Sequence, residues 1–130
     1  MRVVVSGWRN MQDARLMYQI LSRYKITRLA EGGAAGADRL AAMYANSKNI
    51  QHIQYKAAWH TYGKSAGPRR NIQMLVKEKP DLLIAFLHPE SKGTAHIIQE
   101  AQIRNIRTEI VRIATGKAEI ALKAPAKVAI

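Results

Sequence analysis

The chain has 130 residues and no cysteine, so it can bury one hydrophobic core, and disulfides and thiolate zinc sites are excluded. Its 21 Lys and Arg residues against 9 Asp and Glu residues give a net charge of +12, which favours nucleic acids, nucleotides or acidic proteins as partners. The first apolar run is too short for a signal peptide, and no run reaches the roughly 18 apolar residues of a membrane helix, so we expect a cytoplasmic protein.

Predicted strands and helices alternate along the chain. Residues 2–6 form a β-branched run that ends at a glycine, and residues 11–24 carry apolar side chains at helical spacing, with Asp13 near the start. Further strands are predicted at 26–30, 50–55, 81–87 and 106–113. Further helices are predicted at 36–48, 68–77 and 93–105. Residues 57–66 are predicted to form a polar, aromatic loop, and the methionines expected to fill the core are Met11, Met17, Met43 and Met74.

This alternation predicts an α/β fold: a single Rossmann-like domain with a mainly parallel five-stranded sheet and helices on both faces. We assign the domain to residues 1–113. Residues 114–130 are rich in Ala and Lys and are predicted to be a C-terminal tail, either a frayed end or an oligomerisation arm of a homo-oligomer. In such sheets ligands bind beyond the carboxyl ends of the strands.

Four turns built from small residues fall at that edge of the predicted sheet, at residues 6–9, 32–38, 67–71 and 91–95. Small residues there expose backbone N–H groups at helix N-termini, where a phosphate or another anion binds well. The turns therefore predict one nucleotide-sized site. The candidate ligand-binding residues are Ser6, Gly7, Trp8, Arg9, Gly32, Gly33, Gly36, Asp38, Arg70, Asn71, Ser91, Gly93 and Thr94.

Each candidate also has an ordinary structural explanation. The glycines suit tight turns that need a positive φ or close helix packing. Asp38 either favours the helix dipole, accepts hydrogen bonds from a ribose, or orients Arg9 or Arg70. Arg70 suits bidentate contact with phosphate, or is a surface arginine. Ser91, Gly93 and Thr94 either bind the ligand or serve ordinary helix capping.

Aromatic and histidine side chains give weaker signals. Trp8 follows a glycine at the sheet edge and is a candidate for stacking on a base. Trp59 and Tyr62 either stack on a base, close over the site, or anchor their loop to the core. The four histidines show no metal-ligand spacing, so no metal or other cofactor is predicted, apart from Mg²⁺ arriving with a phosphorylated ligand.

Read in order, these motifs resemble a known family. The pattern Gly-Ala-x-Gly-Ala-Asp at 33–38, the segment Trp-His-Thr-Tyr-Gly-Lys-Ser-Ala-Gly-Pro-Arg-Arg-Asn at 59–71, and Gly-Thr-Ala at 93–95 are similar to the YspA-type, cpYpsA-related SLOG proteins. The resemblance covers about residues 3–111. It implies a Rossmann-like domain that binds a phosphorylated nucleotide or an NAD- or ADP-ribose-derived ligand, as a sensor or sequestering protein in bacteria or their phages, often beside conflict systems.

The wider superfamily implies two alternatives. LOG phosphoribohydrolases cleave the N-glycosidic bond of nucleotides, but Ile97 stands where they carry a catalytic glutamate. An apolar side chain cannot act as a general base, so such hydrolysis would have to use Asp38 or Glu100. DprA proteins bind single-stranded DNA, which the positive charge also favours.

Overall fold

The computed structural model describes residues 1–114 and 117–118 of the chain. Five strands form a parallel sheet in the order β3-β2-β1-β4-β5: β1 (Arg2–Gly7), β2 (Arg28–Glu31), β3 (Gln51–Gln54), β4 (Leu82–Leu87) and β5 (Thr108–Ala114). A two-residue strand, β6 (Lys117–Ala118), pairs antiparallel with the end of β5. The predicted α/β fold with a mainly parallel sheet is confirmed. The predicted tail lies largely outside the described residues.

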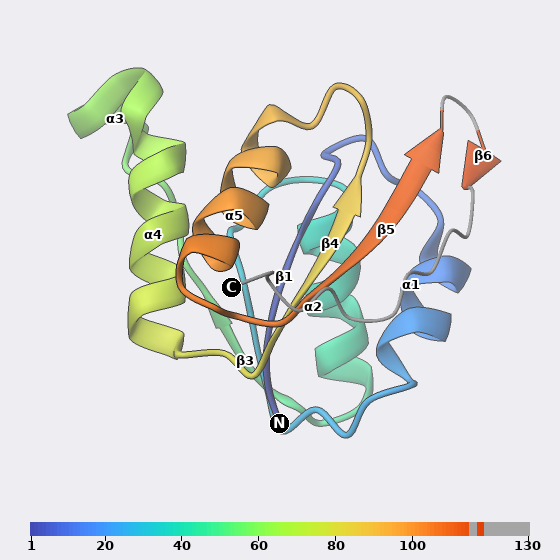
Figure 1. Ribbon diagram of the computed structural model, residues 1–130. Coiled ribbons are helices and arrows are strands. Elements are labelled where there is room, and N and C mark those ends of the chain that lie inside the picture. The colour runs from blue at the N-terminus through green and yellow to red at the C-terminus, as the bar shows by residue number, and fades with distance from the viewer. Residues whose placement is uncertain (115–116, 119–130) are drawn as a thin grey trace.

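Helices cover both faces of this sheet, as predicted (Figure 1). The helices α1 (Ala14–Leu21) and α2 (Ala37–Ser47) pack on one face, and α4 (Ala66–Glu78) and α5 (Lys92–Ile103) pack on the other. The strands alternate accordingly, because successive side chains of a strand point to opposite faces. Val3 and Val5 face α1 and α2, whereas Val4 faces α4 and α5.

The first helix is shorter than its apolar pattern predicts. Asp13 lies before the helix as its N-cap, and its Oδ1 accepts a hydrogen bond from the backbone N–H of Leu16 at 2.9 Å. Met11 precedes the helix but is still buried in the core. The apolar pattern therefore includes a buried residue that is not helical. Met43 is also not core filler: its side chain is 49% exposed, because the buried side of α2 runs through Ala41, Tyr44 and Ala45.

The predicted loop at residues 57–66 is instead helical. It contains one turn of helix, α3 (Trp59–Tyr62), and a 3₁₀ turn, η1 (Gly63–Ser65), which lead into α4. The backbone N–H of Tyr62 donates to the carbonyl of Ala58, and Gly63, with φ of 56°, ends the turn. The polar composition reflects exposure of this segment and does not prevent it from being helical.

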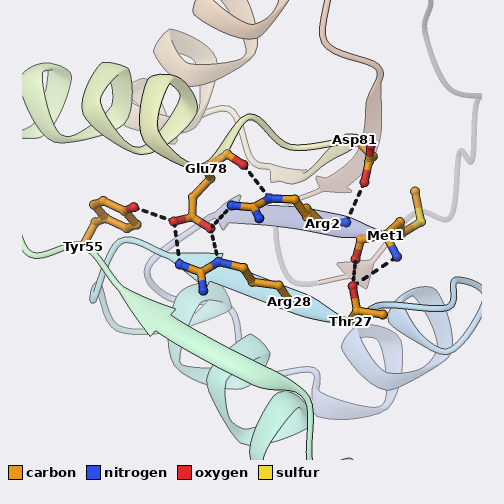
Figure 2. A network of polar contacts seen from close by, with 7 residues as sticks. All are labelled: Met1, Arg2, Thr27, Arg28, Tyr55, Glu78 and Asp81. Carbon is orange, nitrogen blue, oxygen red and sulfur yellow. Dashed lines mark hydrogen bonds and ion pairs between the residues drawn. The ribbon is translucent and has the colours of Figure 1, made fainter.

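At the edge of the sheet where the strands begin, charged side chains connect the end of α4 to β1 and β2 (Figure 2). The Glu78 carboxylate, at the end of α4, accepts from Arg28 Nε at 2.7 Å and from the Tyr55 hydroxyl at 2.5 Å. Arg2 donates to the Glu78 carbonyl at 2.7 Å. Because Arg2 and Arg28 begin β1 and β2, this network fixes one end of the fold and leaves the other edge for a site.

Candidate functional site

A pocket of about 510 Å³ lies at the carboxyl edge of the sheet, where β1 and β4 are neighbours. The chain leaves β1 toward β2 on one side, and it leaves β4 toward β5 on the other. Strand order thus reverses here, which opens a crevice in doubly wound sheets. The pocket is lined by Ser6, Gly7, Trp8, Arg9, Asn10, Ala34, Asp38, Arg70, Asn71, Glu90, Ser91, Lys92, Gly93 and Thr94.

The structure therefore brings ten of the thirteen predicted residues to one pocket, and Gly32, Gly33 and Gly36 do not line it. Sequence reasoning missed Asn10, Ala34, Glu90 and Lys92. Ala34 and Lys92 lie inside predicted turns, at 32–38 and 91–95, but were not chosen as candidates. Asn10 and Glu90 each lie one residue outside a predicted turn, so extending two turns by one residue would have included them.

The first turn of the pocket depends on close packing at Gly7. A Cβ at this position would lie 2.6 Å from Ala37 Cβ and 2.7 Å from Phe86 Cβ, so only glycine lets β1, β4 and α2 meet here. The next residue, Trp8, donates its backbone N–H to the Phe86 carbonyl at 3.0 Å. Its indole is half-buried and stacks on the His88 ring, with centroids 3.8 Å apart and planes 5° apart.

In the second turn, two glycines determine the backbone conformation, and neighbouring residues line the pocket. Gly36 has φ of 72°, and a Cβ there would lie 2.4 Å from the backbone of Arg9. Ala37 donates its backbone N–H to the Trp8 carbonyl at 3.1 Å, so the first two turns cross in direct contact. Gly33, with φ of 74°, donates to Glu31 Oε1 at 2.6 Å. These glycines therefore hold the turns together.

Glu31 is a buried acid that sequence reasoning missed. It ends β2 and is fully buried, with His52 Nε2 at 2.7 Å and Gln54 Nε2 at 3.0 Å from its Oε2. Together with the Gly33 contact, these bonds fix the start of the turn. The available signal was a carboxylate directly after an apolar strand and directly before two glycines.

Asp38 is the acid of the pocket. Its Oδ2 accepts the backbone N–H groups of Gly32 at 3.1 Å and Ala34 at 3.2 Å, which closes the turn around the first turn of α2. Burial raises the pKa of Asp38 to about 7, with a further contribution from the charge of Glu31, while the Ala34 N–H and Arg70 act in the opposite direction. Its Oδ1 is buried and has no hydrogen-bond partner among the described residues.

Arg70 and Asn71 connect the start of α4 to the other turns. Arg70 donates through Nη1 to the Gly32 carbonyl and through Nε to Asn71 Oδ1, the latter at 2.9 Å. Asn71 is buried, and its Nδ2 donates to the Gly93 carbonyl at 3.2 Å. Because these contacts use Nε and Nη1 of Arg70, Nη2 is the nitrogen that remains for a ligand. Burial lowers the pKa of Arg70, while Asp38 and Glu31 raise it, and the guanidinium stays charged.

The fourth turn presents the N-terminus of α5 to the pocket. Ser91 is the N-cap residue, but its hydroxyl accepts the backbone N–H of His88 at 3.2 Å and makes no capping bond to α5. Ordinary capping, the alternative for this turn, is therefore not what Ser91 provides. The first-turn N–H groups of Gly93 and Thr94 have no side-chain partner within the described part of the chain. Lys92 adds a positive charge beside them.

Other residues weighed from the sequence lie away from this pocket. Trp59 approaches Gly67, and Arg69 lies over the Tyr62 ring at 4.4 Å from its centroid, so both aromatics pack against the start of α4. Ile97 is fully buried on the side of α5 that packs against the core. Glu100 pairs with Arg104 at 2.9 Å and does not line the pocket.

Two absences hold for residues 1–114 and 117–118. No three His, Asp or Glu side chains there form a cluster able to hold a metal ion. No helix in the same residues has the length and apolar character that crossing a bilayer requires.

Fold and pocket together define a doubly wound α/β domain with a polar crevice at its topological switch point. The family model of the YspA, cpYpsA-related SLOG family matches residues 1–62. The Gene 61 protein of Mycobacterium phage D29 is 34% identical over 112 residues, covering 78% of this chain and 88% of that protein. The chain belongs to the YspA, cpYpsA-related SLOG family.

A solved structure shares the fold. The DNA processing protein A (DprA) from Streptococcus pneumoniae matches with a TM-score of 0.50 and 17% sequence identity, covering 76% of this chain and 56% of that one. At this identity the similarity shows a common Rossmann-like architecture.

Proposed function

We propose that the pocket binds a phosphorylated nucleotide or an NAD- or ADP-ribose-derived ligand, and that the protein acts as a sensor or sequestering protein. The observation that carries this proposal is the convergence of four separate turns on one pocket that pairs uncapped helix N–H groups with a buried, unpartnered carboxyl oxygen. Phosphate suits the N–H groups, and a ribose hydroxyl suits the carboxyl.

Each part of such a ligand has a matching surface. The phosphate would lie at the N-terminus of α5, where Lys92 and Arg9 add positive charge. Asp38 Oδ1 would pair with a ribose hydroxyl. Trp8 offers the aromatic surface that a base requires. We extend the proposal to a role in conflicts between bacteria and phages, which the family resemblance implies, and a relative of this chain occurs in a phage.

A substitution at Gly93 tests the proposal while sparing the fold. A Cβ at Gly93 meets no atom within 4 Å, so a valine there extends into open space at the edge of the pocket. Calorimetry against nucleoside monophosphates, nucleoside diphosphates, NAD and ADP-ribose should find at least one specific ligand. Gly93→Val should weaken its binding by about 10-fold or more, the equivalent of one charge-assisted hydrogen bond.

Gln73→Val is the matched control, because Gln73 is exposed on α4 and does not line the pocket. It should leave affinity unchanged. Absence of binding across the whole panel, with a folded protein, would refute the proposal.

Hydrolysis is the alternative function, and chromatography of the same samples tests it. The pKa of Asp38 near 7 favours this alternative, since that value suits a general acid. Release of free base that Asp38→Asn abolishes would establish an enzyme.

A further inference from the structure

A second pocket adjoins the first on the far side of the Trp8–His88 stack. It has a volume of about 450 Å³ and is lined by Leu87, His88, Pro89, Ser91, Lys92, Ala95, Arg112 and Ile113. Ser91 and Lys92 line both pockets. Trp8 lines the first and His88 the second, so the stacked rings lie between them. A ligand that passes the shared residues Ser91 and Lys92 would contact both pockets.

His88, which lines this second pocket, carries a hydrogen-bond donor without a partner among the described residues. The side chain is 3% exposed, and Nε2 is buried without a partner among the described residues. Its other nitrogen, Nδ1, accepts the backbone N–H of Glu90 at 3.0 Å. An accepting Nδ1 places the proton of a neutral imidazole on Nε2, so Nε2 is an N–H donor that lacks an acceptor. A buried donor without an acceptor is costly in free energy unless a ligand supplies one.

The charges around this donor favour an anion. Lys92 and Arg112 line the pocket, and among the described residues no carboxylate does. The Glu90 carboxylate, 3.6 Å from His88 Nδ1, lines the first pocket. The remaining walls are largely apolar, which strengthens electrostatic attraction by excluding water. Arg112 is exposed, lies near the end of β5 and lines the pocket.

We propose that this second pocket binds a second anionic group of the ligand held in the first, through the Nε2–H of His88 with Lys92 and Arg112. The inference rests on the proposed function and narrows it. The ligand class becomes a nucleotide with two phosphate groups, either a nucleoside 5′-diphosphate derivative or a nucleoside 3′,5′-bisphosphate.

The test is a ratio of two affinities measured on the same protein. Calorimetry with the four nucleoside 5′-monophosphates, the matching 5′-diphosphates and the matching 3′,5′-bisphosphates gives the gain in affinity from the second phosphate. His88→Phe keeps an aromatic ring against Trp8 and removes the donor. Arg112→Ala removes one charge. Each variant should reduce the gain about 10-fold, as expected for one charge-assisted hydrogen bond.

Arg107→Ala is the control, because it removes the same charge just before the start of β5, where Arg107 lines a different pocket. It should leave the gain unchanged, which separates a built subsite from the general attraction of a basic protein. Thermal unfolding checks that each variant folds. If His88→Phe does not fold, Arg112→Ala by itself still tests the proposal.

The outcomes separate the two proposals. If monophosphates bind, but the second phosphate raises affinity equally in wild type, His88→Phe and Arg112→Ala, the proposal for the second pocket is overturned. The proposed function of the first pocket then stands. An equal loss of gain in Arg107→Ala also overturns the second pocket, because the effect is then one of net charge. Absence of binding by every nucleotide overturns both.

Discussion

At Asp38, one buried carboxyl group serves the fold and faces the pocket. Its Oδ2 holds the turn through the Gly32 and Ala34 N–H groups, yet burial raises its pKa to about 7. The unfolded chain releases this proton near pH 3.9. Between about pH 4 and 7 this carboxyl group therefore binds more protons in the folded protein than in the unfolded chain, and its contribution to the free energy of unfolding falls as pH rises.

We predict that Asp38→Asn removes this dependence. For wild type, the Asp38 contribution should decline by up to about 1.4 kcal/mol per pH unit within this window, the value for one proton. The variant keeps an acceptor oxygen for the turn and cannot ionise. Urea unfolding of both proteins at pH 5, 6 and 7 measures the difference, and parallel slopes for the two would contradict the prediction.

Glycines show where residue-level reasoning from sequence stops. The sequence places Gly36 and Gly93 equally well in phosphate-binding turns. In the structure, a Cβ at Gly36 would lie 2.4 Å from the backbone of Arg9, whereas a Cβ at Gly93 would meet no atom within 4 Å. A tight turn and a ligand contact require the same residue type, and only the surrounding atoms distinguish them.

Among the elements, α4 depends most on a buried charge. Glu78 lies at its C-terminal end, and hydrogen bonds from Arg28 and Tyr55 lower the pKa of its carboxyl group below the usual value, against the effect of burial (Figure 2). A lowered pKa stabilises the fold above the unfolded value of about 4.3, and this stabilisation is lost as pH falls through the folded pKa.

We predict that Glu78→Gln lowers the free energy of unfolding at pH 7 by about 2 kcal/mol, because it leaves Arg28 without its counter-charge. Glu100→Gln is the matched control on α5, where the pair with Arg104 is more exposed and worth about 0.5 kcal/mol or less. Urea unfolding at pH 7 and pH 3 checks both variants. A deficit in Glu78→Gln that is as large at pH 3 as at pH 7 would be evidence against the ion pair.

Secondary structure was predictable where apolar periodicity is strong. The five parallel strands and the four long helices lie where their patterns predict them, although α1 is shorter than predicted. All except β3 bury a face in one of the two cores. The short helical turns of α3 and η1 were missed, since every residue in them is exposed and no apolar pattern marks them. The start of α4 at Ala66 was missed for a different reason: Pro68 predicts the first turn of a helix, but Ala66 and Gly67 before it are buried and already helical.

For the candidate site, the sequence predicted which turns form it but not which side-chain atoms contact one another in it. Parallel strands place their following turns at one edge, so convergence follows from the fold alone. The buried contacts of Glu31 and the orphan nitrogen of His88 depend on which side chains meet across the sheet edge. One sequence without the three-dimensional arrangement does not contain that information.

At the scale of the whole molecule, burial makes the surface more basic than composition indicates. Of the nine acidic residues, Glu31, Asp38, Glu78 and Glu109 are buried. The 21 Lys and Arg residues are thus opposed by few exposed acids. Such a surface attracts any polyanion, and single-stranded DNA is the alternative partner that it favours.

Salt distinguishes the pocket from this surface charge. Binding to a DNA oligonucleotide through surface lysines and arginines releases counterions and weakens steeply between about 50 and 200 mM salt. A phosphate held at the N-terminus of α5 beside the partly buried Arg70 is screened less.

The most direct test of the account is calorimetry of the wild-type protein at 50 and 200 mM salt, with the best ligand of the nucleotide panel and with a single-stranded DNA oligonucleotide. We predict that nucleotide affinity changes only a few-fold, while DNA affinity falls by at least about 10-fold and shows no sequence preference. DNA binding that persists at 200 mM salt, together with no binding from the nucleotide panel, would contradict the account and establish nucleic acid as the partner.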